Sequence, residues 1–280
     1  MKISLSVIIL TYNEEINLPC ALNSVVNWAD QVFIVDSFST DKTLDIAKSY
    51  NVPVYQNLWK DWATQRNWAL DNLPLKHDWV LFLDADECVS TKLSEEVRGT
   101  LKNVPDEVNG FYINRRFKFL GRELKHGSYN PNWVLRLVRT NKLRILSAGD
   151  SEYFKVEGKV LRLKSFMFHE DKKDLAFFIN KHNKISELAT KKLFNKEKNS
   201  NEDDPRRYAV EGKYRVLLKE NILNKLPLFW RPFFLFIYKY FLKLGFMDGK
   251  EGLIYYFLHD FWYPFLIDAK ILEMRKKPNK

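Results

Sequence analysis

The sequence predicts an α/β fold in which a mostly parallel sheet is wrapped by helices. Along the first ninety residues, short apolar and β-branched runs alternate with segments of helical periodicity. Such alternation is typical of parallel strands joined by right-handed helical crossovers. Polar clusters come directly after three of the apolar runs, which is where ligands bind in sheets of this kind.

The first strand is expected at residues 4–10, which are apolar and rich in β-branched side chains. Apolar residues then recur at helical spacing between 18 and 29, with Asn17 as a candidate N-cap and Pro19 in the first turn. Further strands are expected at 31–35, 52–55 and 79–83, with helices from the turn at 37–41 through Lys48 and at 62–70.

After residue 90 the pattern changes to alternation typical of strands with one buried face. We expect strands at 111–119 and 133–138, two more within 156–168, and an amphipathic helix at 175–194. Residues 195–207 hold almost no apolar side chain and are expected to be a linker or exposed loop. The sequence therefore predicts one domain over 1–200, with halves at 1–90 and 91–200, followed by a helical, aromatic region over 201–280.

The net charge of +10 is concentrated near the C-terminus, where residues 206–280 hold 15 Lys and Arg against 7 Asp and Glu. A basic region of this kind attracts nucleic acid or an anionic membrane. Cys20 and Cys88 lack metal-ligand spacing and are expected to be reduced, inert thiols of a cytosolic protein. No secretory signal is expected at the N-terminus.

The motif Asp84-Ala85-Asp86 directly follows the strand expected at 79–83. Two carboxylates at that place can hold a divalent cation that bridges the diphosphate of a nucleotide. The alternative is that Asp84 and Asp86 cap the next helix. No G-x-G-x-x-G and no G-x-x-x-x-G-K-[ST] occurs, which argues against the usual dinucleotide enzymes and against P-loop NTPases.

Three clusters, Thr11-Tyr12-Asn13-Glu14, Asp36-Ser37 and Asp84-Ala85-Asp86, resemble in order and spacing the family 2 glycosyltransferases of the GT-A fold. The similarity extends to the bacterial branch that adds a sugar, often glucose, to the inner core of lipopolysaccharide, whose Gly-Phe-Leu-Asp-Gly resembles Gly245–Gly249 here. The resemblance implies metal-dependent, inverting transfer from a nucleotide sugar, expected to be UDP-glucose, to a lipid-linked saccharide. It places the nucleotide sugar on residues 1–90, the acceptor on 91–200 and the enzyme at the cytoplasmic face of the inner membrane.

The resemblance also implies roles for individual residues. Asp36 stands where the family accepts a hydrogen bond from uracil, Tyr12 where a ring packs on the base, and Asp86 where a carboxylate binds Mg²⁺ or Mn²⁺. Arg66 and Asn67 either reach the sugar or diphosphate or form a solvated helix face. The full set implied to contact the nucleotide sugar is Thr11, Tyr12, Glu14, Asp36, Ser37, Arg66, Asn67, Asp84 and Ala85.

An inverting transfer needs a carboxylate that takes the proton of the acceptor hydroxyl. Glu152 is the candidate base, at a place where the family branch usually shows His-Glu and this chain has Ser-Glu. Asp150 would share a strand face with it and is the second candidate. His169 resembles the histidine that completes metal coordination in this fold, although a lone histidine is more often structural.

Sixteen of the 42 aromatic residues lie between Leu226 and Phe265. The apolar run 226–242 is too short to span a bilayer and contains Arg231 and Lys239. It is typical of an interfacial helix whose basic residues meet anionic lipid, and the alternative is that the aromatics pack as core. Because Leu, Ile and Pro separate the aromatics, lipid is favoured and no nucleic-acid partner is expected.

Two other functions remain open from the sequence. A nucleotidyltransferase would use a similar sheet and metal site, but normally needs a glycine-rich phosphate loop, and residues 11–17 contain no glycine. A non-catalytic protein that binds a nucleotide sugar or a polyanion is the other alternative.

Overall fold

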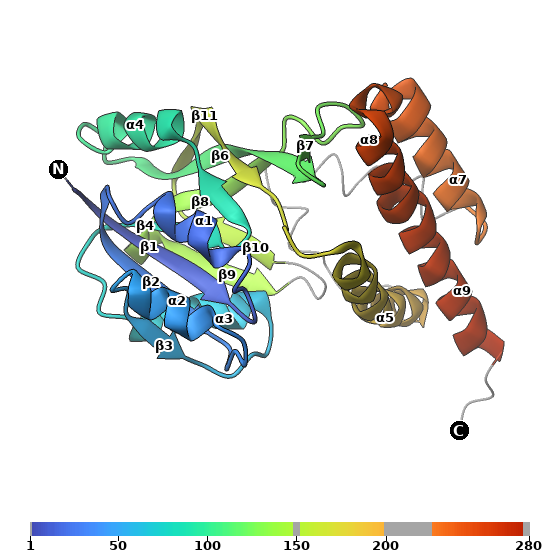
Figure 1. Cartoon of the computed structure of the whole chain (residues 1–280), viewed down its shortest axis with the longest axis horizontal. Coiled ribbons are helices and arrows are strands. Elements are labelled where there is room, and N and C mark those ends of the chain that lie inside the picture. The colour runs from blue at the N-terminus through green and yellow to red at the C-terminus, as the bar shows by residue number, and fades with distance from the viewer. Residues whose placement is uncertain (1, 148–151, 199–225, 277–280) are drawn as a thin grey trace. The chain divides into compact units, whose positions relative to one another are not determined.

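The computed structural model describes residues 2–147, 152–198 and 226–276 (Figure 1). The chain divides into two compact units. The first unit comprises Met1–Gly121, Asn130–Leu146 and Phe154–Lys172, and the second comprises Arg122–Tyr129, Ser147–Tyr153 and Lys173–Lys280.

The first unit is built on a sheet whose strands follow the order β3-β2-β1-β4-β8-β6-β11-β5. β3, β2, β1 and β4 run parallel, whereas β8 is antiparallel to both β4 and β6. The strands of the chain are β1 (Ile3–Thr11), β2 (Ala29–Asp36), β3 (Val54–Gln56), β4 (Trp79–Asp84), β5 (Glu87–Val89), β6 (Val108–Phe119), β7 (Arg122–Glu123), β8 (Trp133–Arg139), β9 (Leu143–Ser147), β10 (Glu152–Val156) and β11 (Lys159–His169).

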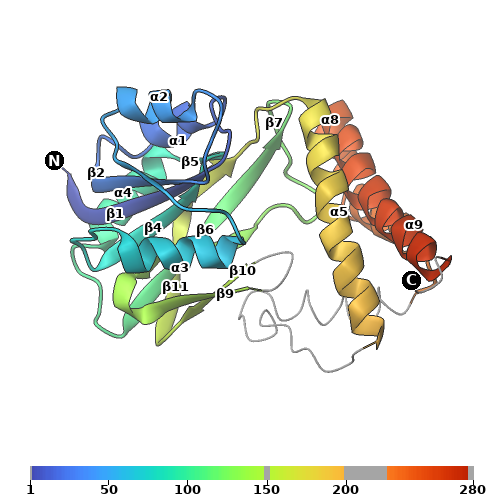
Figure 2. The same cartoon turned by 90° about the horizontal axis from the view of Figure 1, so that it is seen from below.

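Helices cover both faces of this sheet, as the apolar alternation along β1 requires (Figure 2). Leu5, Val7 and Ile9 point to one face, where α1, α2 and α4 pack, while Ile8 points to the other, where α3 and the β9–β10 pair pack. The helices of this unit are α1 (Leu18–Asn23), α2 (Thr43–Ser49), α3 (Trp62–Asn72) and α4 (Thr91–Thr100), with a 3₁₀ turn η1 (Thr140–Lys142). The predicted α/β architecture is confirmed.

Two expectations about local structure are wrong. Asn17 occupies the N-cap position of α1, but its side chain makes no capping hydrogen bond because it is bonded to Glu14, Asp171 and Lys172 instead. The region 156–168 does not hold two strands; β11 alone spans most of it, and β10 ends where that region begins.

Cys20 and Cys88 are joined by a disulfide, so the expectation of two reduced thiols is wrong. The bond links α1 to β5, whose Cα atoms at these positions lie 5.9 Å apart although 68 residues separate them in the chain. This contact cannot be predicted from local sequence, because it arises from the packing of α1 against the distant strand that follows Asp86.

Removing the disulfide is expected to lower the free energy of unfolding by about 4 kcal/mol, because the bond closes a long loop and restricts the unfolded chain. The double variant Cys20→Ser/Cys88→Ser, compared with the native protein in urea unfolding, measures this loss. Thiol titration of the denatured, unreduced protein should find no free thiol. Two titratable thiols, together with unfolding midpoints that a reductant does not change, would contradict the assignment.

The second unit consists mainly of helices, among which α5 packs against α9. α5 (Leu175–Lys198) confirms the helix expected at 175–194. The other helical segments are α7 (Trp230–Phe236) continued by a π-helical turn η4 (Ile237–Leu242), a 3₁₀ turn η5 (Gly245–Asp248), and α8 (Gly249–Tyr255), η6 (Tyr256–Trp262) and α9 (Tyr263–Lys276), which follow one another without a break. Across residues 2–147, 152–198 and 226–276, no helix combines the length and apolar character needed to cross a bilayer.

Candidate functional site

The three polar clusters meet at one edge of the sheet in the first unit. Thr11, Asp36 and Asp84 are the last residues of β1, β2 and β4. The strand register places Thr11 beside Asp36 and Leu10 beside Asp84. Because these strands are parallel neighbours, their carboxyl ends share one edge, where ligands bind in open α/β sheets.

Asp36 is fully buried and organises the loops at this edge. Its carboxylate accepts hydrogen bonds from the Thr11 hydroxyl at 2.8 Å, from the backbone N–H and hydroxyl of Ser39, and from the Gln56 amide at 3.3 Å. A carboxylate offers about four acceptor positions, so the protein's own donors occupy them. A hydrogen bond from a uracil ring to Asp36 therefore requires one of these donors to move.

The loop after β1 is held in a fixed shape and presents an aromatic ring to solvent. Asn13 adopts a left-handed conformation, its N–H donates to Ser39 and its side-chain oxygen accepts from the Thr40 N–H. Tyr12 is 59% exposed, so its ring is available to a planar ligand. Ser37 is buried and accepts a hydrogen bond from Gln65 at 3.1 Å.

Two arginines neutralise Asp84. Arg66 of α3 and Arg136 of β8 bind its two carboxylate oxygens separately. The Arg66 side chain is 1% exposed, and its guanidinium lies 5.3 Å from the centre of the Phe82 ring and 5.7 Å from that of Phe154. The negative charge of Asp84 is thus balanced by two arginines of the protein itself.

Burial alone would raise the pKa of the Asp84 carboxyl, but the charges of Arg136 and Arg66 outweigh burial. They hold that pKa far below its ordinary value of 3.8. Asp84 is therefore ionised at every pH at which the protein would be assayed.

Glu87, the first residue of β5, belongs to the same ion-pair network as Asp84. Its side chain is fully buried, and one oxygen lies 3.2 Å from both Arg115 and Arg136. The other oxygen accepts the backbone N–H of Asp84 at 3.0 Å. The network fixes the backbone that carries Asp84, Ala85 and Asp86, and Ala85 itself is buried in the core.

Asp86 and His169 form the pair best suited to a metal ion. Asp86 Oδ2 lies 3.1 Å from His169 Nε2, and both side chains are partly exposed. β11 ends at His169, where its register pairs it with Glu87, and the Glu170 N–H donates to the Asp86 carbonyl at 2.9 Å. A pocket of about 150 Å³ lies beside Asp86 and is also lined by Asn17, Lys118 and Lys172.

The carboxylate of Asp86 and the imidazole of His169 fit a divalent cation whose coordination a nucleotide would complete. Mg²⁺ in enzymes is typically held by one or two carboxylates plus substrate phosphates, and a neutral imidazole is a common ligand of metal ions in proteins. Within the ranges that the structure describes, no three His, Cys, Asp or Glu side chains gather as a metal held by protein alone would require. Asp86 and His169 would supply two ligands of such a cation, and phosphate and water would supply the others.

The remaining predicted residues fall in different places. Glu14 accepts a hydrogen bond from Asn17 at the loop after β1. Arg66 and Asn67 are not a solvated helix face: Arg66 is buried against Asp84, and Asn67 exchanges two hydrogen bonds with the backbone of Ile145. Glu152 begins β10, in a segment assigned to the second unit, and Asp150 lies outside the described residues.

Four residues of this edge were not assigned a role in the site from the sequence: Asn17, which was expected only to cap a helix, Glu87, Arg115 and Arg136. Arg136 is a charged residue within the apolar run of β8, which is a signal that could have found it. Arg115 lies in an alternating strand whose polar residues are expected to face solvent. Its contact with Glu87 depends on the order of the strands, which sequence spacing does not reveal.

The sequence matches the model of Glycosyl transferase family 2 over residues 6–167. An uncharacterized glycosyltransferase of Rickettsia bellii (strain RML369-C) is 42% identical over 93 residues, which are 33% of this chain and 31% of the relative. An uncharacterized glycosyltransferase of Haemophilus influenzae is 24% identical over 174 residues, 58% of each chain. The chain thus matches less than two thirds of the length of these relatives.

Solved structures show the same fold at low identity. S. aureus TarS 1-349, crystallised with UDP-GlcNAc, superposes with a TM-score of 0.50 at 15% identity, covering 97% of this chain and 92% of TarS. The mannosyltransferase PcManGT from Pyrobaculum calidifontis, crystallised with GDP-Man and Mn²⁺, gives a TM-score of 0.53 at 11% identity over 99% and 89% of the two chains. Since the family model covers more than half of the sequence and the fold agrees, the chain belongs to the family 2 glycosyltransferases of the GT-A fold.

Proposed function

We propose that this glycosyltransferase moves a hexose, glucose in the first instance, from a UDP-sugar to a lipid-linked saccharide of the bacterial envelope such as the lipopolysaccharide inner core. The reaction inverts the anomeric centre and depends on Mg²⁺ or Mn²⁺. The observation that carries the proposal is the Asp86–His169 pair, which lies at the same sheet edge as Asp36 and Asp84.

The donor is bound from two sides of this edge. The exposed ring of Tyr12 packs on the uracil base, and the loop that Asp36 holds closes around the nucleoside. Asp86 and His169 hold the cation, which when bound neutralises charge on the leaving diphosphate. The structures of TarS with UDP-GlcNAc and PcManGT with Mn²⁺ support a nucleotide sugar and a divalent cation in this fold.

The transfer requires a base for the acceptor. Its hydroxyl oxygen attacks C1 of the sugar from the face opposite the diphosphate, the new C1–O bond forms, the bond from C1 to the diphosphate breaks, and the hydroxyl proton passes to a carboxylate. We assign this carboxylate to Glu152, with Asp150 as the second candidate. Glu152→Gln keeps the shape of the side chain and removes its basicity, so it separates catalysis from binding.

The proposal is tested by incubating the protein with individual UDP-sugars and Mn²⁺ and measuring UDP release in the presence of lipid-linked saccharide acceptors. One sugar should support turnover above the others, and excess EDTA should abolish it. Turnover that EDTA leaves unchanged, or release of pyrophosphate instead of UDP, would refute the proposed reaction.

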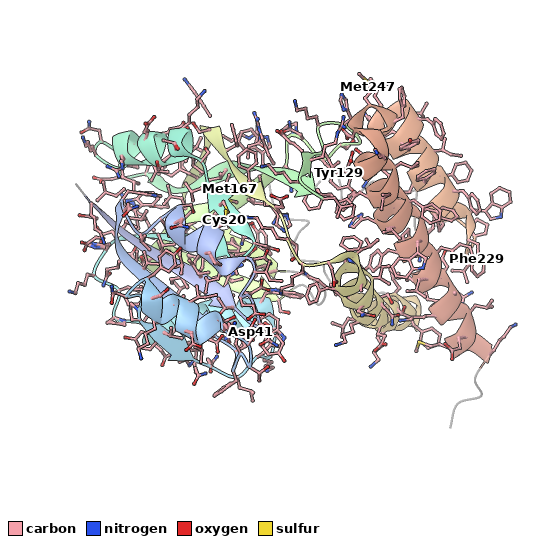
Figure 3. All side chains as sticks on the ribbon, viewed as in Figure 1. Cys20, Asp41, Tyr129, Met167, Phe229 and Met247 are labelled. Carbon is pink, nitrogen blue, oxygen red and sulfur yellow. A yellow bond between two sulfur atoms is a disulfide. The ribbon has the colours of Figure 1, made fainter. Side chains whose placement is uncertain are left out.

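A lipid-linked acceptor would explain why the second unit has an exposed apolar face. Side chains project from α7 on the side away from α9 (Figure 3). The exposed apolar residues of α7 and η4 are Trp230, Phe233, Phe234, Ile237, Tyr238, Phe241 and Leu242. Aromatic rings of this density suit the interface of a bilayer, and we propose that this face docks the enzyme at the cytoplasmic surface of the inner membrane.

The basic residues within this helix do not have the role that the sequence suggested. Arg231 is paired with the fully buried Asp268, and Lys239 lies 2.7 Å from the buried Asp260. Their charges are neutralised within the unit, so docking rests mainly on apolar contact, with the exposed Lys243 and Lys250 left to meet anionic headgroups.

Replacing Trp230 and Leu242 by glutamate is expected to weaken binding to phosphatidylglycerol-containing vesicles roughly a hundredfold, because each side chain transferred into the interface contributes about 1.5–3 kcal/mol. Co-sedimentation measures the loss. Leu58→Glu, at a residue of the first unit that is 76% exposed, is the matched control and should bind as the native protein does. Native protein that stays in the supernatant, or a double variant that binds unchanged, would contradict membrane docking.

A further inference from the structure

The Asn17 side chain joins two loops of the first unit that belong to different parts of the proposed site. We infer that Asn17 is a positioning residue that couples the nucleotide loop after β1 to the metal-binding pair Asp86–His169. The inference rests on the proposed function, because it concerns how the nucleotide and the cation support each other's binding.

The contacts of Asn17 use both donors of its amide and one of the two acceptor positions of its oxygen. Nδ2 donates to a Glu14 carboxylate oxygen at 2.8 Å and to an Asp171 carboxylate oxygen at 2.9 Å. Oδ1 accepts the backbone N–H of Lys172 at 2.8 Å. The residue is 2% exposed, and its partners lie 3 positions before it and 154 and 155 positions after it.

The hydrogen bonds of the Asn17 side chain form a bridge between two loops. One of them is the loop after β1, which would contact the nucleoside. Glu14 follows Thr11 and Tyr12, and its N–H donates to the Thr43 hydroxyl of α2 at 2.8 Å. Asn17 and Leu18 both donate their backbone N–H to the Glu14 carbonyl. The loop is therefore tied to α2 at Glu14 and to the rest of the site through the Asn17 side chain.

The other end is the segment directly after His169. The Glu170 N–H is bonded to the Asp86 carbonyl, and the next two residues, Asp171 and Lys172, are bonded to Asn17. A shift of the nucleotide loop is thereby transmitted to the end of β11, where His169 faces Asp86. Groups bonded directly to metal ligands typically change metal affinity by 10–100-fold when removed, and Asn17 acts one step further out, through the backbone that follows His169.

An amide is the side chain that this position requires. Its NH₂ group donates to two carboxylates at once, while its oxygen accepts a backbone N–H. Aspartate has the same shape but no donor, and it would place a third negative charge beside Glu14 and Asp171. Asn17→Asp therefore removes both donated hydrogen bonds, to Glu14 and to Asp171, without changing the volume of the side chain.

The test compares UDP binding by calorimetry with and without Mn²⁺. Coupling between two ligands is reciprocal, so the ratio of the two UDP affinities measures how far the nucleotide and the cation support each other. In the native protein Mn²⁺ should tighten UDP binding, and in Asn17→Asp this enhancement should fall about tenfold. The control is Asn109→Asp on β6, which also loses a buried side-chain hydrogen bond, to the Glu157 carbonyl, and should keep the full enhancement.

The alternative outcomes are distinct. If Asn17→Asp lowers the melting temperature but keeps the native enhancement, Asn17 is only structural and the inference is wrong. If Asn17→Asp does not fold, Asp171→Ala breaks the bridge from the other side, and an unchanged enhancement in that variant overturns the inference. Native protein that does not bind UDP at all refutes the proposed function itself.

Discussion

Replacing Asp86 by alanine is expected to lower the rate of UDP-sugar turnover roughly a thousandfold. The variant lacks one of the two side chains proposed to hold the cation, and a bound metal would stabilise developing charge on the diphosphate by several kcal/mol. The measurement is UDP release at saturating donor and Mn²⁺. Because Asp86 is partly exposed and its partner His169 also packs against Phe117 in a tilted arrangement, the fold should tolerate the change.

A matched control separates this effect from the loss of any carboxylate. Asp106→Ala removes an exposed aspartate from the loop before β6 and should leave the rate unchanged. An Asp86→Ala enzyme that keeps a tenth or more of the native rate would show that the metal is held elsewhere.

Replacing Arg66 by alanine is expected to lower the free energy of unfolding by about 3–5 kcal/mol. The change leaves Asp84 with one of its two cationic partners and removes a buried side chain packed on Phe82 and Phe154. Urea unfolding at neutral pH measures the loss. The control is Arg144→Ala, which breaks the exposed 2.7 Å pair with Asp71 and should cost no more than about 1 kcal/mol.

The same ion pair predicts how stability depends on pH. Because the pKa of Asp84 lies far below 3.8 in the folded protein, the unfolded chain binds the proton more readily. The stabilisation is complete above the ordinary pKa and is lost as the pH falls below about 4. Asp84→Asn should reduce the slope of stability against pH in that range by up to about 1.4 kcal/mol per pH unit. An equal slope in the variant, or a loss of stability confined to alkaline pH, would contradict this account.

The sequence was most informative where chemistry follows directly from the end of a strand. Asp36 and Asp84 come immediately after apolar runs, and in a parallel sheet this alone places them at one edge. The proximity of Asp86 and His169 could not be predicted in this way. β11 reaches the metal site only because it lies beside β5, and that order of strands is not readable from local periodicity.

Buried polar residues were the hardest to predict. Arg66 lies in a helix rich in polar side chains, so the sequence left open whether it faces solvent or the nucleotide sugar, and its partner carboxylate comes from a strand 18 positions away. Asn17 precedes a helix, as N-caps do, but its bonding partners are supplied by a loop more than 150 residues later. In both cases a tertiary contact, and not local preference, decides where the side chain points.

We propose that Asp86 and His169 together bind the cation that accompanies the nucleotide. Crystals of the protein with UDP and Mn²⁺, measured at a wavelength where manganese scatters anomalously, test it most directly. We predict one anomalous peak, which marks a manganese ion bonded to Asp86, to His169 and to the diphosphate of UDP. A manganese ion bonded to Asp84, or UDP bound at this edge with no manganese beside Asp86, would contradict the account.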